Sequence, residues 1–469
     1  MSEVSATAFV ERRNEARAAF ARAWRLPVAA PTWEAAAIAV LIPMLLVAAL
    51  WNGFPLMFYD TGAYIFQGFT GRFVPERSPV YSLFLWYAGA GVTIWSIAIV
   101  QAVITAFVVV ETARAVAPHI ALGTVLAIGG ALTILTGLPW YVGEAEPDCF
   151  TALLVLSLYL LAFHSQTLGR WRALALFLIA VLSVGVHPSH LGLAAGLVIL
   201  TALYTLFVRR PPWPRPKLLL PCASIVLSLT LTLGANFHYT RHIFISRAGG
   251  VFAMARMMQD GIVTKVLDET CAAKHFDLCP YRDTLPTRAD QYLWGPKTPF
   301  NKLGRFTKTE KESDAIVRES LWRYPWLNLE MAAKDAVEQF VIFHTGDGID
   351  PQQWIIGRDF RIFMPSQLPA YGIALQQKGG IPFRAINFLH LPVAWLGLVL
   401  LIAGFLFALG KSDCRTAVLF GFVLAALMGN AMICGVLSGP HARYQSRLIW
   451  TPILALALVG SSRLALRQE

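Results

Sequence analysis

A carboxylate that closely follows the first long apolar run is the residue best placed to do chemistry. Asp60 comes only a few residues after that run ends, and Tyr64 and Arg77 follow it. A carboxylate at the edge of a bilayer is partly desolvated, which raises its basicity. Asp60 is therefore suited to abstracting a proton or binding a polar substrate presented on a lipid. A helix cap, or an ion pair with Arg72 or Arg77, explains the same residue without chemistry.

A second acidic segment carries three carboxylates within five residues, between two apolar runs. Glu144, Glu146 and Asp148 repel one another unless a cation, a metal ion or a substrate compensates them. Asp148 follows Pro147, so it fits the start of a helix as well as it fits a functional role. For Glu144 and Glu146 we favour solvated charges.

The segment before the last apolar run is basic. Arg443 and Arg447 are four residues apart and would share one face of a helix, with His441 and Tyr444 beside them. Two guanidinium groups so placed grip a phosphate through paired hydrogen bonds. Snorkelling of both arginines to the lipid headgroups is the alternative.

Two further pairs of residues carry weaker signals. His187 and His190 are three positions apart and could bind a metal ion, but a polar turn that starts a helix is the better interpretation. Cys271 and Cys279 lie in a polar segment, where they either form a disulfide or remain two free thiols.

The elements that position these residues are membrane helices. The chain has 469 residues, 56% of them hydrophobic and 14% charged, with a mean hydropathy of +0.55. A soluble domain is far less apolar. We therefore expect an all-α polytopic membrane protein with about ten transmembrane helices. The expected spans are 34–52, 92–112, 119–138, 149–164, 173–187, 190–208, 218–236, 388–410, 416–437 and 448–464.

The distribution of Lys and Arg predicts the orientation. With the N-terminus in the cytoplasm, the short inside segments hold sixteen Lys and Arg and the short outside segments hold four. This pattern predicts N-in/C-in topology, and it explains the net charge of +11 without nucleic-acid binding. We expect a basic amphipathic segment on membrane lipids, an N-terminal module with the first and second periplasmic loops, a mainly helical extracytoplasmic domain and C-terminal transmembrane helices. Their ranges are 1–33, 34–236, 237–387 and 388–469.

Asp60 with a nearby tyrosine, the acidic second loop, the large outside domain and the His441–Tyr444 stretch together resemble GT-C-fold glycosyltransferases. The resembling group includes the protein mannosyltransferase and aminoarabinose transferase-like enzymes. The chain departs from their commonest pattern, because Thr61 follows Asp60 where an Asp-Glu pair is usual, and because many relatives have more spans.

The resemblance implies transfer of a sugar from a polyprenyl-phosphate donor to a glycan, lipid or protein of the cell envelope, at the outer face of a bacterial inner membrane. Asp60 would be the base and Asp148 the second acidic residue, with Glu146 competing for that place. No cofactor is certain, a divalent metal stays open, and no metal ligand is assigned. The implied substrate-binding residues are Tyr64, Arg77, Glu146, His441, Arg443, Tyr444 and Arg447.

Other classes of function remain open. A flippase or transporter of lipid-linked saccharides would favour ionisable residues in the middle of spans, and the apolar runs carry few of them. A polymerase or ligase of such saccharides would depend on Arg and His of 237–387. A structural assembly factor without chemistry is the fourth alternative.

Overall fold

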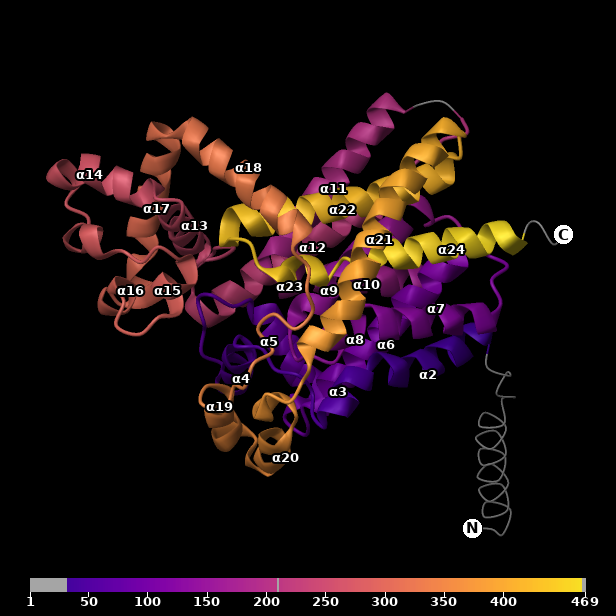
Figure 1. Ribbon diagram of the computed structural model, residues 1–469, viewed down its shortest axis with the longest axis horizontal. Helices are drawn as coiled ribbons and strands as arrows, with labels where there is room; N and C mark the ends of the chain where they lie inside the picture. Colours follow the sequence, from indigo (N-terminus) through magenta and orange to yellow (C-terminus); the bar gives the residue numbers. More distant parts are fainter. Residues whose placement is uncertain (1–31, 209–210, 466–469) are drawn as a thin grey trace, which may run out of the picture.

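The computed structural model describes residues 32–208 and 211–465, and the fold of these residues is helical (Figure 1). The described part of the chain has no β-sheet; one isolated bridge joins Leu56 to Glu144. The amphipathic segment expected at 1–33 lies almost entirely outside the described residues. The prediction of an all-α architecture is therefore confirmed for the residues described.

Seven helical segments in the described residues are long and apolar enough to cross a membrane. By length and composition they are the helices of a multi-pass membrane protein. They are α2 (Trp33–Leu45) continued by α3 (Val47–Asn52), α6 (Trp95–Val116), α11 (Pro188–Phe207), α12 (Leu219–Thr240), α21 (Phe383–Gly410), α22 (Cys414–Ser438), and α23 (Ala442–Ser446) with α24 (Thr451–Ala465).

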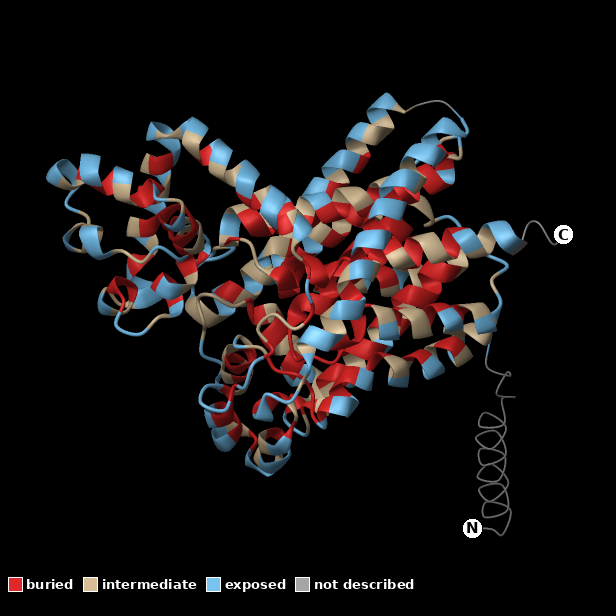
Figure 2. Cartoon of the chain, in the orientation of Figure 1, coloured by how far each residue is buried: buried red, intermediate tan, exposed pale blue. Residues whose placement is uncertain are grey.

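The other three expected spans are also helices, but shorter ones. They are α7 (Leu122–Leu135), α9 (Phe150–Phe163), which the 3-10 turn Pro147–Cys149 precedes, and α10 (Arg170–Val186). Every residue of α9 from Phe150 to Ala162 is buried. Figure 2 shows buried residues concentrated in this middle part of the bundle. The chain thus surrounds α9 on all sides, so this helix is the centre of the fold.

The first part of the expected outside domain has a hydrophobic core of its own. Val251, Ile262, Phe300 and Ile316 belong to this core. A disulfide joins Cys271 to Cys279, so the predicted pairing is confirmed. The helices are α13 (Gly249–Gln259), α14 (Ile262–Lys274), α15 (Ala289–Trp294), α16 (Pro299–Lys302), α17 (Arg305–Arg323) and α18 (Pro325–Val341). In Figure 1 the helices α14 to α17 lie apart from the bundle, whereas α18 runs back to it and packs on α22.

The second part of this expected domain, 343–387, packs on the loop between α3 (Val47–Asn52) and α6 (Trp95–Val116). The ring of Tyr371 stacks on Phe360 with centroids 4.7 Å apart, and both rings contact Phe54. Gln376 accepts a hydrogen bond from the amide of Met57 (3.0 Å) and donates one to its carbonyl (2.6 Å). This return segment therefore fixes the loop that carries Asp60. Its helices are α19 (Ile356–Phe363) and α20 (Leu368–Ile373), and the loop they contact contains α4 (Thr61–Thr70) and α5 (Pro79–Leu85).

A buried acid, Asp335 of α18, lies near α13 and predicts a pH effect. Arg256 of α13 forms an ion pair with Asp260 and lies 3.7 Å from Asp335 of α18. Burial, and then the Asp260 carboxylate, raise the pKa of Asp335 to about 6. The folded protein holds this proton more tightly than the unfolded chain does. The contribution of Asp335 to stability is therefore lost as the pH rises from about 4 through about 6.

The substitution Asp335→Asn should remove this pH dependence. Relative to the wild type, the variant should gain about 1 kcal/mol of stability between pH 5 and pH 7, since asparagine does not ionise. Thermal unfolding in detergent at both pH values measures the difference. Glu330→Gln, at an exposed acid of the same helix, is the matched control. If the difference in stability between Asp335→Asn and the wild type is the same at pH 5 and pH 7, the raised pKa of Asp335 is contradicted.

Candidate functional site

Two loops that are distant in sequence are joined at one end of the bundle. The amide of Leu56 donates to the carbonyl of Gly143, and the amide of Ala145 donates to the carbonyl of Leu56, each at 2.9 Å. The Thr61 hydroxyl lies 3.1 Å from Glu146 Oε1. The loop that follows α3 and the loop that follows α8 (Leu138–Val142) are thus one hydrogen-bonded unit, with Asp60 and the acidic segment on it.

An alternating chain of charges runs through this unit to the segment before the last helix. Asp60 forms an ion pair with Arg77, and its Oδ2 lies 3.8 Å from Nη2 of Arg443. Arg443 Nη1 lies 3.7 Å from Asp148 Oδ2, and Arg447 Nη1 donates to Asp148 Oδ1 at 2.6 Å. We call Arg77, Asp60, Arg443, Asp148 and Arg447 the charge chain. It carries one more positive than negative charge, which suits binding of an anion.

The charge chain is open to solvent at one end only. The side chains of Asp148 and Arg447 are 2% and 0% exposed, whereas that of Asp60 is 15% exposed. Buried charges of this kind are retained when they are paired and hydrogen-bonded. A ligand can therefore reach the chain at Asp60. Arg447, at the buried end, holds Asp148 in place behind Arg443.

Arg443 is held by residues that sequence reasoning did not single out. Its guanidinium carbon lies 3.9 Å from the centroid of the Phe58 ring, and its amide donates to Asp347 Oδ2 at 3.1 Å. Gly348 has φ +79°, and a Cβ there would lie 1.8 Å from Phe58. Only glycine allows the backbone this close to the ring that positions Arg443.

Arg447 is held from the neighbouring helices. Its Nη2 donates to Asn430 Oδ1 at 3.2 Å and lies 3.4 Å from Ser189 Oγ. Asn430 in turn donates to the carbonyl of Tyr444 at 2.6 Å. A polar amide in the middle of the apolar helix α22 is a functional signal in membrane proteins, and it could have identified Asn430 from the sequence.

The interpretation of Glu144 and Glu146 as solvated charges is wrong. Their exposed fractions are 2% and 1%. Burial, and then the carboxylate of Asp60, raise the pKa of Glu146 well above its usual value. Burial followed by Asp148 does the same to the pKa of Glu144. The bridge to Leu56 draws this loop inward, which explains the burial.

The arginines do not snorkel, because both are paired inside the protein; Arg443 is 9% exposed as a residue. Tyr444 lies beside them, with its ring 5.0 Å from the Arg443 guanidinium carbon and 5.2 Å from that of Arg447. Tyr64 is buried against Tyr81, with ring centroids 4.8 Å apart, and forms a wall of the site. These tyrosines shape the site without pairing with the carboxylates.

His187 and His441 both contact other parts of the fold. His187 caps α11, because its Nδ1 accepts a hydrogen bond from the amide of Ser189 at 3.2 Å. The interpretation as a helix start is confirmed. His441 Nε2 lies 3.7 Å from Asp290 Oδ2 of α15, so this side chain faces the outside helices.

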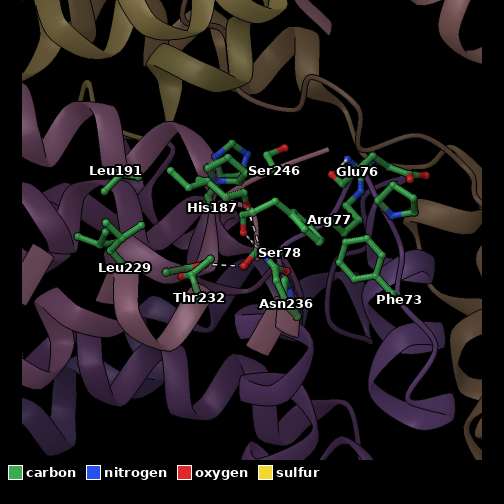
Figure 3. Close-up of a pocket in the computed structure, with 17 residues that line it drawn as sticks. Phe73, Glu76, Arg77, Ser78, His187, Leu191, Leu229, Thr232, Asn236 and Ser246 are labelled. Atoms are coloured by element: carbon green, nitrogen blue, oxygen red, sulfur yellow. Dashed lines mark hydrogen bonds between the residues drawn. The ribbon is translucent and has the colours of Figure 1, made fainter. Parts of the chain in front are cut away.

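A small pocket adjoins the charge chain at Arg77. Its volume is about 30 Å³, room for about one water molecule. Figure 3 shows Leu191 and Leu229 on one side of it and Phe73 and Glu76 on the other. The pocket therefore connects Arg77 with apolar side chains of α11 and α12.

Among residues 32–208 and 211–465, no group of three or more His, Cys, Asp or Glu side chains is arranged to hold a metal ion. Searches of protein-family models, curated proteins and solved structures return no match to the chain. The site must therefore be interpreted from its own geometry.

Proposed function

We propose that the protein is a GT-C-like membrane glycosyltransferase. It moves a sugar from a polyprenyl-phosphate donor to an acceptor hydroxyl on a cell-envelope glycan, lipid or protein. The observation that carries the proposal is the charge chain, in which the partly exposed carboxylate of Asp60 lies between two arginines. A lipid-linked phosphate needs guanidinium partners and its acceptor needs a base, and the charge chain has both.

The donor phosphate binds Arg443 and Arg77 and so releases Asp60 from its ion pairs. Asp60 then takes the proton of the acceptor hydroxyl as the acceptor oxygen forms its bond to the anomeric carbon. The bond from that carbon to the phosphate oxygen breaks, and polyprenyl phosphate leaves with the electron pair. Attack from the face opposite the phosphate inverts the configuration. One carboxylate is sufficient, because phosphate leaves without a strong acid.

A divalent metal ion does not fit this set of residues. Asp60 and Asp148, the two carboxylates at the centre, each lie within 4 Å of Arg443. Guanidinium groups thus already occupy the places that a cation would take, so the arginines supply the positive charge for the phosphate.

The proposed setting is a bacterial inner membrane, with about ten crossings and both ends in the cytoplasm. The long apolar helices and the three shorter ones support this number. In Figure 1, α2 begins and α24 ends on the same side of the bundle. The charge chain then faces the outside, where envelope acceptors are exposed.

Binding of polyprenyl phosphate tests the proposal without knowledge of the sugar. The purified protein should bind polyprenyl phosphate and not the uncharged polyprenol, as measured by thermal stabilisation in detergent. Arg443→Gln should weaken this binding by about tenfold or more, since a charge-assisted contact is lost.

Arg241→Gln is the matched control, because Arg241 is an exposed arginine at the end of α12, away from the charge chain. It should bind like the wild type. Equal affinity for polyprenol and polyprenyl phosphate would overturn the proposal.

A further inference from the structure

A large cavity lies at the end of the bundle opposite the charge chain. Its volume is about 1,090 Å³. The helical segment Pro147–Phe163 connects the two ends, because Asp148 is in its first turn and Tyr159 and Phe163 line the cavity. At 1.5 Å per residue this segment is about 25 Å long, which is close to the thickness of the apolar layer. The cavity therefore opens at the opposite face of the membrane.

The lining of the cavity is basic. Five Lys and Arg side chains face two carboxylates, Glu34 and Asp413. Asp413 is paired with Arg463 at 2.7 Å, and Arg114 is paired with Glu111 at 2.9 Å. The five basic residues are Arg114, Arg215, Lys217, Arg415 and Arg463.

Two of these cations have no carboxylate to neutralise them. In the part of the chain that the structure describes, no Asp or Glu oxygen lies within 4.0 Å of the Lys217 or Arg415 side chain, and both side chains are exposed. The two residues come from different segments, the one before α12 and the start of α22. The fold brings both charges to one cavity, where they can attract an anion.

The general excess of basic residues at a cytoplasmic face does not require this arrangement. Arg170 and Lys411 satisfy the same rule, yet they lie outside the cavity, next to the rings of Trp171 and Phe407. The cavity also has an apolar wall that includes Phe163. It therefore offers charge for a phosphate together with a surface for hydrocarbon.

We propose that this cavity binds the phosphate-bearing headgroup of an anionic membrane lipid, with Lys217 and Arg415 as its charged contacts. Basic pockets between helices at the cytoplasmic face are suited to such headgroups. The volume accommodates a headgroup with part of its acyl chains. The site is separate from the charge chain and does not depend on sugar transfer.

The test uses the full-length protein in detergent and in nanodiscs. The probes are phosphatidylglycerol, phosphatidylcholine and inorganic phosphate, and native mass spectrometry counts the lipids that remain bound. Wild type should retain phosphatidylglycerol in preference to phosphatidylcholine. The affinity of the double variant Lys217→Gln/Arg415→Gln for phosphatidylglycerol should be lower than that of the wild type by about tenfold or more.

The double variant Arg170→Gln/Lys411→Gln removes the same charge from the same face outside the cavity, and it should bind like the wild type. Thermal unfolding verifies that both variants are folded. Millimolar inorganic phosphate should leave the lipid bound in wild type. Displacement of the lipid by it would overturn the assignment to a lipid and identify a soluble phosphate instead. Equal loss in the two double variants, or no preference for phosphatidylglycerol, would overturn the proposal.

Discussion

The proposed function predicts that Asp60→Asn removes one sugar from the surface glycans of cells that depend on this protein. General-base catalysis contributes roughly 10²- to 10⁴-fold to a rate, so the variant should be close to a gene deletion. Asparagine keeps the size of the side chain and an oxygen for Arg77, which limits the effect on folding. The measurement is the residue composition of the surface glycans, in deletion cells that express wild type or variant at matched abundance.

Asp350→Asn is the control for this prediction. Asp350 is an exposed acid of the same face, 3.4 Å from the Tyr59 hydroxyl and outside the charge chain. It should restore the glycans as the wild type does. Surface glycans that keep their full composition and length with Asp60→Asn would exclude the proposed mechanism. A change confined to chain length or attachment would instead identify a polymerase or ligase of lipid-linked saccharides.

Asp148→Ala should destabilise the protein by about 3 to 5 kcal/mol, because it leaves Arg447 buried without its carboxylate. The Arg447 side chain is 0% exposed, and its 2.6 Å hydrogen bond to Asp148 is its only ion pair among the described residues. Thermal unfolding in detergent and the yield of folded protein measure the loss.

The double variant Asp148→Leu/Arg447→Met separates charge burial from packing. Removal of both charges should restore most of the stability, since neither ion is then left unpaired. Binding of polyprenyl phosphate should stay weak in this variant, because the support for Arg443 is gone. A single variant as stable as the wild type would show that the pair does not hold this end of the bundle.

The sequence identified the segments of the charge chain but not the contacts within it. Asp60 follows the first apolar run and Arg447 precedes the last one, so the predicted topology puts both at the same boundary of the apolar layer. Their connection through Arg443 and Asp148 depends on packing between residues about 300 positions apart. Local patterns carry no information about such contacts. The roles of these residues in transfer remain predictions for the experiments above.

Burial of the acidic loop was the clearest failure of sequence reasoning. Glu144 and Glu146 have the composition of a solvated turn, yet the backbone bridge to Leu56 draws them inside. The sequence also did not indicate where the domain that follows α12 ends. We expected 237–387 to form one domain, whereas contacts such as that of Gln376 with Met57 join residues 343–387 to the loop that carries Asp60.

The burial of α9 on every side has a mechanical consequence. A helix with no free face is unable to slide or tilt unless its neighbours move with it, because protein interiors are close-packed. Asp148, in the turn that precedes α9, is therefore anchored at one position along the bundle. In the proposed reaction the donor lipid would have to bring its phosphate to this fixed position, and any adjustment would have to come from the peripheral loop that bears Arg77.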